Sequence, residues 1–579
     1  MKLLLSFKSP LKLHSLILPS LSFHTSFLKF STSLPALKFP TTRPPSTPSP
    51  KSMATSISSP KPLVQVKDNI ELTETEEKIF HRLLGTLRHF NLQTQLRVAG
   101  GWVRDKLLGK DCYDIDIALD NMLGSEFVDK VREYLLTVGE EAQGVAVIPC
   151  NPDQSKHLET ARMRIFDIWI DFVNLRCEEY SENSRIPAKQ KFGTAEEDAY
   201  RRDLTINSLF YNINLSIVED FTKRGLSDLK FGKIVTPLPA KATFMDDPLR
   251  VLRAIRFCAR FEFTLDEELK EAAACEEVKA ALAAKISRER IGVEIDLMIA
   301  GNQPVKAMSY ICDLTLFWTV FTLPANTEPE ISEVCNSLCI ACLDATWNLI
   351  QLIKCFTFND EQKRLSMYAS LFLPFRKFTF KDKKSKKVPV VNYIFRDSLK
   401  RKVSDADTVV NVHQALEKFL SLIPLVSKEE IQPNGLDWGV GCEDVPVTSR
   451  IRVLTGLLLR EIKDFWPVAL LMATLLYPAN VDYTQDLLNR HYELEKRKEL
   501  FDVVYNEIVK LGLENVWEVK PLVNGKEIMN ILQLKAGGPL VREWQQKILA
   551  WQLARPSGTS EECLDWIREM HSKRVKLDE

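Results

Sequence analysis

The sequence predicts an α+β domain followed by a long all-α region. Short apolar stretches with strand-like alternation, separated by helix-like spacing, occur between residues 96 and 175. From about residue 292 onward the apolar residues keep helical spacing, and no strand-rich stretch is expected. With 579 residues the chain is too long for a single core, so we expect several domains.

The elements of the α+β part follow from local periodicity. An amphipathic helix is expected from about residue 71 to 87, and a strand over 96–99 that breaks at two glycines into a helix. We then expect strands over 113–119, 145–148, 158–166 and 168–175, a helix over 124–138, and a polar loop over 178–197.

The Gly100-Gly101 pair predicts a phosphate-binding turn. A strand that breaks at two glycines before a helix leaves backbone N–H groups bare beside the helix N-terminus, where an anion is favoured. The alternative is a turn with no ligand.

Asp114 and Asp116 predict a cation site. Residues two apart on a strand share a face, so both carboxylates should point the same way while the intervening isoleucines pack behind them. Neighbouring carboxylates repel each other unless a cation lies between them, and Mg²⁺ prefers oxygen ligands. A solvated strand end is the alternative. Together, the glycine turn and the aspartates predict a nucleotidyl-transfer site.

Composition limits the other possibilities. The net charge is zero, so a nucleic-acid surface must be a local patch. Twelve cysteines without short paired spacings fit a reducing compartment, and Cys335, Cys339 and Cys342 are expected along one helix stripe rather than around an iron–sulfur cluster. No apolar run reaches the roughly 20 residues that a membrane helix needs, so no membrane association is expected.

The first 67 residues have the composition of an organelle transit peptide and linker. They contain no Asp or Glu, they are basic, and they are rich in Ser, Thr and Pro. We expect import into mitochondria, chloroplasts or both. Translation from Met53 would give a form for the cytoplasm and nucleus, and the basic end at 573–578 resembles a short nuclear import signal.

A second motif, residues 200–210, contains Arg202, Asp203 and Asn207, which can share one side of a helix. Asp203 could form an ordinary salt bridge there, or the basic pair could face a triphosphate. The residues alone leave both interpretations open.

Five segments in this order resemble the class II CCA-adding enzymes, tRNA nucleotidyltransferases of the polymerase-β superfamily. They are Gly-Gly-x-Val-Arg-Asp-x-Leu-Leu-Gly, Asp-x-Asp, Arg-Arg-Asp-x-Thr-x-Asn-Ser, Asp-Asp-Pro-Leu-Arg-x-x-Arg-Ala-x-Arg-Phe and Ser-Arg-Glu-Arg-Ile, between residues 96 and 297. Bacterial poly(A) polymerases share these motifs. The resemblance implies a polymerase-β-like nucleotidyltransferase head over 68–215, a neck over 216–300, a helical body over 301–430 and a tRNA-binding tail over 431–579.

The resemblance also implies roles for single residues. Gly100, Gly101 and Arg104 would hold the incoming triphosphate, Asp114 and Asp116 the Mg²⁺, and Arg202 with Asp203 the triphosphate and sugar. Asp247 and Arg250 would read the base, with Arg253 and Arg256 as further nucleotide contacts. The family usually has Glu-Asp where this chain has Asp246-Asp247, which leaves the base-reading pair intact. A third carboxylate, Asp171, is an open possibility.

Hydrogen-bond complementarity explains how Asp247 and Arg250 could select a base. A carboxylate only accepts and a guanidinium only donates, so three apart on a helix they complement the amine and ring nitrogen of cytosine or adenine. Uracil and guanine present the opposite pattern and would leave both groups unpaired. The alternative is that Asp247 only caps the helix that begins at Pro248, unless Asp246 takes the cap.

Two basic segments could contact RNA. Residues 375–402 interleave lysines and arginines with aromatic residues, which predicts either a solvated loop or an RNA-backbone surface. Residues 535–540 open a helix with a Gly-Pro start that could hold a phosphate or be a plain cap.

We therefore expect template-independent addition of CCA to the acceptor end of tRNA, from CTP and ATP and with Mg²⁺. The alternatives are a poly(A) polymerase of the bacterial type, which would add no cytidine, and a non-catalytic RNA-binding relative, which would be expected to have lost parts of the site.

Overall fold

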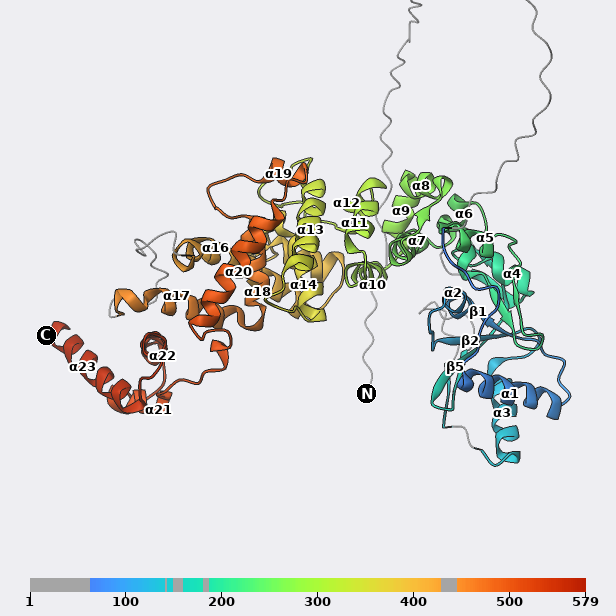
Figure 1. Ribbon diagram of the computed structural model, residues 1–579, viewed down its shortest axis with the longest axis horizontal. Helices are drawn as coiled ribbons and strands as arrows, with labels where there is room; N and C mark the ends of the chain where they lie inside the picture. Colours follow the sequence, from blue (N-terminus) through green and yellow to red (C-terminus); the bar gives the residue numbers. More distant parts are fainter. Residues whose placement is uncertain (1–62, 141–142, 149–159, 181–186, 428–444, 579) are drawn as a thin grey trace, which may run out of the picture. The chain divides into compact units, whose positions relative to one another are not determined.

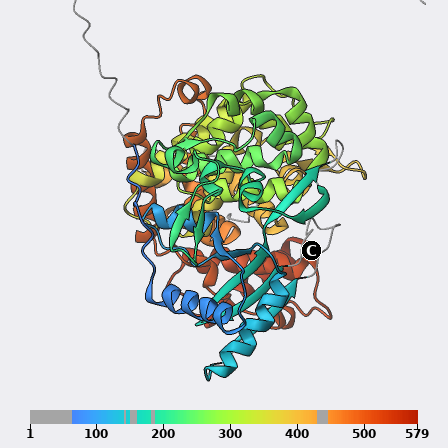
Figure 2. The ribbon, with the colours of Figure 1, turned by 90° about the vertical axis from the view of Figure 1, so that its right-hand side faces the viewer.

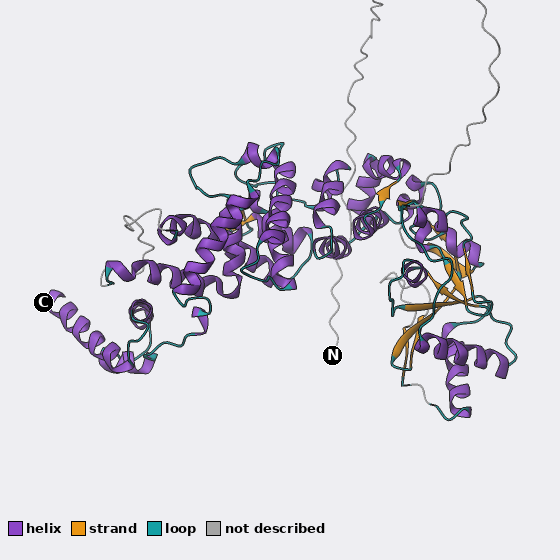
Figure 3. Ribbon diagram, viewed as in Figure 1, coloured by secondary structure: helices purple, strands orange, loops and turns teal. Residues whose placement is uncertain are grey.

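The computed structural model describes residues 63–140, 143–148, 160–180, 187–427 and 445–578 (Figure 1). The expected transit peptide, the Met53 start and most of the linker lie outside these residues. Figure 3 shows that strands are concentrated in the first part of the described chain and that helices dominate the rest, as the sequence predicts.

A seven-stranded mixed sheet forms the centre of the first part. Its order is β3-β4-β5-β2-β1-β8-β9, and every neighbouring pair is antiparallel except β2 with β5. The strands are β1 Leu96–Ala99, β2 Ile115–Leu119, β3 Gly144–Ile148, β4 Thr160–Ile165, β5 Ile168–Asn174, β8 Phe210–Asn212 and β9 Ile217–Glu219.

The register of this sheet brings the two predicted motifs together. β1 and β2 run antiparallel with Val98 opposite Ile117, so the end of β1 at the glycine turn lies beside the start of β2 at the aspartates. The parallel pairing of β2 with β5 places Asp171 directly beside Asp116. The pairing of strands β1, β2 and β5, rather than a loop, therefore brings these residues together.

Helices α1 Glu74–His89, α2 Gly101–Leu107 and α3 Gly124–Thr137 pack in the core that the sheet lines. Figures 1 and 2 show α1 (blue) and α3 (cyan) side by side, and both contribute apolar residues to the core that the sheet also lines. The carboxylate of Glu76 on α1 accepts hydrogen bonds from Trp102 Nε1 (3.0 Å) and Lys106 Nζ (2.7 Å) on α2. This buried contact fixes the helix that follows the glycine turn.

Two expectations for the region after β5 are wrong. The segment expected as a polar loop over 178–197 contains the paired strands β6 Arg176–Tyr180 and β7 Pro187–Phe192 and the start of α4 Ala195–Tyr200. The second motif is not one helix either, because α4 ends at Tyr200 and only a short 3₁₀ turn, Thr205–Asn207, follows before β8. The alternating pattern of β6 and β7 is largely polar, so apolar periodicity could not identify them.

The rest of the described chain is mainly helical. The elements from 225 to 320 are α5 Gly225–Lys230, β10 Lys233–Ile234, α6 Ala240–Asp246, α7 Leu249–Phe261, β11 Thr264–Leu265, α8 Glu267–Ala274, α9 Glu276–Lys285, α10 Arg288–Ile299, α11 Pro304–Asp313 and α12 Phe317–Val320. The later helices are α13 Cys335–Leu352, α14 Asp360–Leu371, α15 Val390–Tyr393, α16 Val403–Val426, α17 Val447–Ile462, α18 Trp466–Leu475, α19 Thr484–Leu488, α20 Leu494–Lys510, α21 Gly525–Ile531, α22 Pro539–Ala554 and α23 Ser560–Asp578.

The helical part departs from the expectation at one point, since strands β12 Thr379–Lys381 and β13 Lys387–Pro389 form a hairpin within the basic segment. Cys335, Cys339 and Cys342 lie buried on α13, where their spacing placed them. The last helices have a core of their own, which runs from Val523 to Ile567. None of the described helices is both long and apolar enough to span a membrane.

Candidate active site

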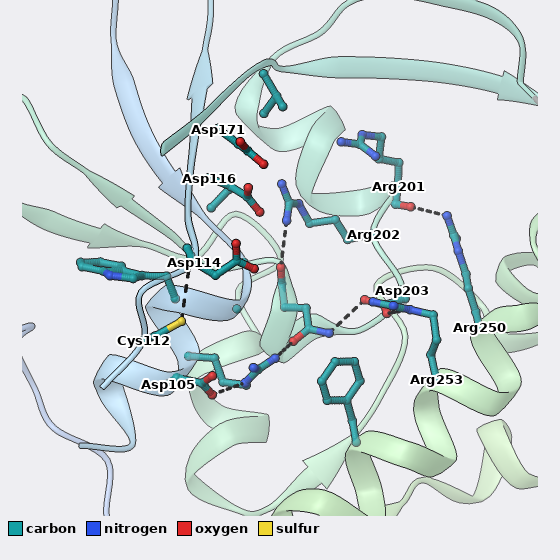
Figure 4. Close-up of a pocket in the computed structure, with 18 of the residues that line it drawn as sticks. Asp105, Cys112, Asp114, Asp116, Asp171, Arg201, Arg202, Asp203, Arg250 and Arg253 are labelled. Carbon is teal, nitrogen blue, oxygen red and sulfur yellow. Dashed lines mark hydrogen bonds and ion pairs between the residues drawn. The ribbon is translucent and has the colours of Figure 1, made fainter. Parts of the chain in front are cut away.

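A cavity of about 840 Å³ lies where the glycine turn, the start of β2, the segment after α4 and helix α7 meet (Figure 4). Its size is in the range of small-ligand pockets. Ten of the eleven predicted site residues line it: Gly100, Gly101, Arg104, Asp114, Asp116, Arg202, Asp203, Asp247, Arg250 and Arg253. Arg256 is the one that does not line the cavity.

The glycine turn has a backbone that only glycine adopts without strain. Gly100 has φ +71°, and a Cβ there would lie 2.8 Å from Arg202 Nη1, so the turn also needs the space. The N–H of Gly100 donates to the carbonyl oxygen of Leu209 (2.9 Å), which leaves the N–H groups of residues 101–103 without intrahelical acceptors. Because α2 has only seven residues, anion binding here would depend on these N–H groups and on nearby arginines rather than on a long helix dipole.

Arg104 is buried at the junction of the head and α7. Its Nε donates to Asp105 (2.9 Å), its Nη1 donates to the side chain of Asn207, and its guanidinium lies over the rings of Phe257 and Phe261. Its Nη2 is directed at the glycine turn, 3.6 Å from the position of a Cβ on Gly101. Arg104 therefore has one donor facing the cavity and the others engaged in fixing its position.

The carboxylates of Asp114 and Asp116 point to the same side, as predicted, and Figure 4 shows them in a row with Asp171 facing Arg202. Asp114 is exposed and Asp116 is half-buried, with Ile115 and Ile117 buried behind them. Burial, followed by the charges of Asp114 and Asp171, raises the pKa of Asp116 to about 6, although Arg202 and Arg162 offset part of this rise. A cation beside Asp116 would relieve this repulsion.

Asp171 is in a different state from its neighbours. Arg162, opposite it on β4, donates Nε and Nη2 to its two carboxylate oxygens at 2.5 and 3.1 Å. This two-point contact neutralises Asp171 and raises the pKa of Arg162 through the hydrogen bond. The register places Asp171 beside Asp116, but the carboxylate of Asp171 is already paired with Arg162.

The aspartates of the cavity thus divide into two groups. Four are each in an ion pair with an arginine: Asp105 with Arg104, Asp171 with Arg162, Asp203 with Arg253, and Asp247 with Arg290. Asp114 and Asp116 are in no ion pair with any residue that the structure describes. The uncompensated negative charge of the cavity is therefore concentrated at the start of β2.

These two carboxylates suit a hard divalent cation that is shared with a substrate. Within the described ranges, no group of three or more His, Cys, Asp or Glu side chains could hold a metal ion by itself. Mg²⁺ is commonly bound by one or two carboxylates, with water and substrate phosphates completing its shell. The donor set at the start of β2 fits this type of site.

Asp198 on α4 organises the basic wall of the cavity. It is almost completely buried, and its oxygens accept hydrogen bonds from Arg201 and Arg202, the latter at 2.8 and 3.0 Å. Burial disfavours its charge, but Arg202 and Arg201 outweigh this effect and keep the pKa of Asp198 below its ordinary value. Ala195 and Ala199 on α4 pack in one buried cluster with sheet residues such as Ala118 and Phe210.

Asp203 is buried and serves as a junction between the head and α7. It accepts hydrogen bonds from Asn207 Nδ2 (3.1 Å) and Arg253 Nε (2.7 Å). Burial opposes its ionisation, but Arg253 and Asn207 lower the pKa of Asp203 to about 2. From the sequence, Asp203 could form a salt bridge or the basic pair beside it could face a triphosphate. The structure shows the salt bridge with Arg253, and Asp203 also lines the cavity.

Asp247 lies just before α7 rather than on it, in extended conformation with φ −133°. Its Oδ1 accepts from the N–H of Leu249 (3.2 Å), so it caps the helix start, and its Oδ2 pairs with Arg290 Nη2 (3.1 Å). A carboxylate has about four lone-pair sites, so two remain for a base. Arg250 is in no ion pair with a described residue, and its Nη2 donates to the carbonyl oxygen of Arg201 (2.7 Å).

Glu294 on α10 holds the remaining arginines of α7. Its Oε2 accepts from Arg256 Nε (2.6 Å), and its Oε1 lies 4.0 Å from Arg253 Nη1. Arg256 also lies over the ring of Phe257. This engagement on the side away from the cavity explains why Arg256 does not line it.

Sequence reasoning missed Asp198, Glu294 and the role of Arg290. Asp198 precedes Arg201 and Arg202 by three and four residues, a helical spacing that could have identified it. Arg290 and Glu294 are distant in sequence from their partners Asp247 and Arg256, so only the packing of α10 against α7 reveals them.

Comparison with known proteins agrees with this geometry. Residues 96–235 match the family described as the Poly A polymerase head domain. The mitochondrial CCA tRNA nucleotidyltransferase of Candida glabrata is 33% identical over 86% of this chain and 96% of its own length. The Saccharomyces cerevisiae protein of the same name is 33% identical over 87% and 94%. The chain belongs to the CCA tRNA nucleotidyltransferase family.

The fold of the family extends over most of the chain. The crystal structure of the Bacillus stearothermophilus CCA-adding enzyme in complex with CTP covers 87% of this chain and all of its own, with a TM-score of 0.56 at 17% identity. The polymerase-β-like head followed by helical regions is therefore confirmed. Nucleotidyltransferases of this fold generally use a divalent metal ion.

The position of Asp198 gives a first prediction. Asp198→Asn keeps the size of the side chain but removes the charge that holds Arg201 and Arg202, so both guanidiniums should lose their fixed positions at the cavity wall. We expect kcat/KM for nucleotide incorporation to fall about tenfold or more, which corresponds to roughly 1.4 kcal/mol. Steady-state kinetics on CCA-lacking tRNA would measure this.

The control for Asp198 is Glu196→Gln, which removes an exposed charge two residues away on the same helix. Equal kcat/KM for the two variants would show that Asp198 does not position the arginines.

Proposed function

We propose that this chain binds CTP and ATP in the cavity and adds CCA to the 3′ end of tRNA with release of pyrophosphate, using Mg²⁺. The observation that carries the proposal is the charge pattern of the cavity. Asp114 and Asp116 form no ion pair with an arginine of the described chain, whereas the other cavity aspartates each do. Family membership over most of the chain favours CCA addition above the poly(A) polymerase alternative, whose name the head match alone would also allow.

The residues divide the work of nucleotidyl transfer. Asp114 and Asp116 would hold Mg²⁺, which supplies neutralisation of charge and a lower pKa for the attacking hydroxyl when it is bound. The N–H groups after Gly100, with Arg104 and Arg202, orient the triphosphate so that its α-phosphate lies in line with the tRNA 3′ hydroxyl. Asp203 acts mainly by holding Arg253 and Asn207 in place.

Base selection would depend on Asp247 and Arg250. Arg250 is free of carboxylates among the described residues and can donate to a ring nitrogen, and Asp247 retains lone pairs for an exocyclic amine. Cytosine and adenine offer this pattern, while uracil and guanine would leave both groups unpaired. A single pocket could then accept CTP and ATP without a nucleic-acid template.

Several wider assignments belong to the same proposal. We place the catalytic head at 68–215, the nucleotide-selecting neck at 216–300, the body at 301–430 and the tRNA-binding tail at 431–579. The composition of residues 1–67 supports organelle import, and relatives that are named mitochondrial make the mitochondrion the favoured destination. Import into chloroplasts and nuclear or cytoplasmic forms from Met53 are further possibilities to be tested by fractionation.

The function is tested by incubating CCA-lacking tRNA with CTP, ATP and Mg²⁺. We expect the wild-type chain to add two cytidines and one adenosine, because the pocket complements both bases. Asp114→Asn and Asp116→Asn should each lower kcat by about 10²-fold or more, since the metal contributes several kcal/mol to the transition state. Sequencing gels of the products measure both effects.

Asp111→Asn is the matched control, because Asp111 is exposed just before the motif and should be dispensable. Addition of adenosine alone would favour the poly(A) polymerase. Full activity of either motif variant would exclude a metal-binding role for that aspartate.

Selectivity is tested at Asp247 with two substitutions. Asp247→Asn retains an oxygen that can cap Leu249, since Asn and Asp are equally good caps, but it changes the hydrogen-bonding face offered to a base. We expect it to incorporate UMP or GMP at least about tenfold more readily relative to CMP. The melting temperature should fall less than in Asp247→Ala, because Asn keeps the cap and loses only the ion pair with Arg290. Competition assays with the four nucleotides, together with thermal melting, provide the measurements.

Asp247→Ala loses both functions and should show lower selectivity and lower stability. Wild-type selectivity in both variants, with the larger drop in melting temperature for Asp247→Ala, would assign this residue to a structural role alone.

A further inference from the structure

The basic segment 375–402 contains two kinds of cations. Some are neutralised by the fold: Arg376 and Lys377 pair with Glu417, Lys400 pairs with Asp397, and Arg401 pairs with Asp296. The lysines of the β12–β13 hairpin are different. Lys381, Lys383, Lys384, Lys386 and Lys387 are all exposed, and none is in an ion pair with a residue of the described chain.

Backbone hydrogen bonds close the turn of this hairpin, and they engage its acidic residue, Asp382. Asp382 Oδ1 accepts hydrogen bonds from the backbone N–H groups of Lys384 (2.8 Å) and Lys386 (2.9 Å). The N–H of Ser385 donates to the carbonyl oxygen of Asp382 (2.9 Å), and the N–H of Asp382 donates to that of Lys386 (3.0 Å). The carboxylate therefore stabilises the turn, and it forms no ion pair with a hairpin lysine in the described part of the chain.

The strands below the turn add a like-charge contact. Lys381 lies directly opposite Lys387 in the antiparallel register, and like charges in such a pair are destabilising. An acidic residue, Glu328, lies beside this strand. Its backbone pairs with that of Thr379, which is two residues before Lys381, and its carboxylate forms no ion pair with a hairpin lysine. A bound polyanion would remove this repulsion.

The aromatic residues of the segment pack on one another and are half-buried, except Phe375 and Phe395, which are buried. Phe378 packs against Phe375, and Phe380 packs edge-to-face on Tyr393 with ring centroids 5.6 Å apart in both cases. The side-chain amide of Asn326 also donates to the carbonyl oxygen of Lys381 (3.1 Å), which ties β12 to the neighbouring loop. These ring contacts anchor the hairpin, and its exposed side chains are mainly lysines rather than aromatic residues.

We propose that the lysine hairpin, residues 379–389, is a contact surface for the phosphate backbone of tRNA. Lysines are point charges on flexible stems, which suits sequence-independent contact with phosphates. The chain has zero net charge, so attraction for RNA must come from such local patches. The inference rests on the proposed function, because it takes the same tRNA as the partner of the hairpin.

The test replaces the five hairpin lysines together: Lys381→Gln, Lys383→Gln, Lys384→Gln, Lys386→Gln and Lys387→Gln. The matched control changes five exposed lysines that make no ion pair in the described structure: Lys223→Gln, Lys233→Gln, Lys354→Gln, Lys363→Gln and Lys463→Gln. Both variants lose the same charge, and thermal melting shows whether both fold. Binding of CCA-lacking tRNA is measured by fluorescence anisotropy between about 50 and 200 mM salt.

We expect the hairpin variant to bind tRNA about tenfold more weakly than the wild type near 0.1 M salt. The slope of log Kd against the logarithm of the salt concentration should be smaller by about two or more. Its KM for tRNA should rise while kcat at saturating tRNA stays at the wild-type value. Binding and salt dependence equal to those of the control variant would overturn the inference. So would unchanged tRNA binding with loss of binding to vesicles that contain phosphatidylserine, which would make the hairpin a membrane contact.

The two proposals fail in different ways. If the wild-type chain adds no CMP to this tRNA, the proposed function fails. If the wild-type chain is active but the hairpin variant binds tRNA as the control variant does, only the hairpin inference fails.

Discussion

The site depends on the repulsion between Asp114 and Asp116, two neighbouring carboxylates that form no ion pair with a described residue. β2 carries Asp116 at its start with Asp114 just before it, and β5 adds the charge of Asp171 beside them. Arg162 compensates Asp171, but no described residue forms an ion pair with the other two. Two adjacent carboxylates that have no ion-pair partner among the described residues favour a bound cation, because a cation would relieve their repulsion.

The remaining charges of the cavity serve the opposite purpose. Asp198, Asp203 and Glu294 are buried, and each holds one or two arginines with hydrogen bonds. Breaking such a buried pair typically costs about 3 to 5 kcal/mol, so these contacts keep the guanidiniums in fixed positions. Fixed dipoles and charges stabilise a transition state without reorganising, which is the main requirement for phosphoryl chemistry. Helices α4, α7 and α10 are thereby linked to the sheet through charge as well as through apolar packing.

Sequence reasoning could reach the centre of the site because its signals are local. The alternation from Asp114 to Leu119 predicts that both aspartates point the same way. The glycine pair before α2 predicts the turn. The helix start near Pro248 and the start of α22 at Pro539 could also be predicted from the sequence. These features depend on the periodicity of neighbouring residues, which a single sequence contains.

Contacts between distant segments could not be obtained in this way. The pairing of Arg162 with Asp171 depends on strand register, and that of Arg290 with Asp247 depends on how α10 packs against α7. The strands β6, β7, β12 and β13 have polar or charged patterns that resemble loops, so they were expected as loop or as part of a helical region. Asp247 itself was expected on a helix, but the proline that follows it favours extended backbone, and α7 begins at Leu249.

The central claim is that Asp114 and Asp116 together hold a divalent ion against a nucleoside triphosphate at the glycine turn. The most direct test is a crystal structure with CTP and Mn²⁺, in which anomalous scattering locates the metal. The account predicts a Mn²⁺ ion bound by both carboxylates and by phosphate oxygens of CTP, with Arg202 beside the triphosphate. It would be contradicted by a metal bound elsewhere, or by the two carboxylates turned apart and paired with arginines while CTP occupies the cavity.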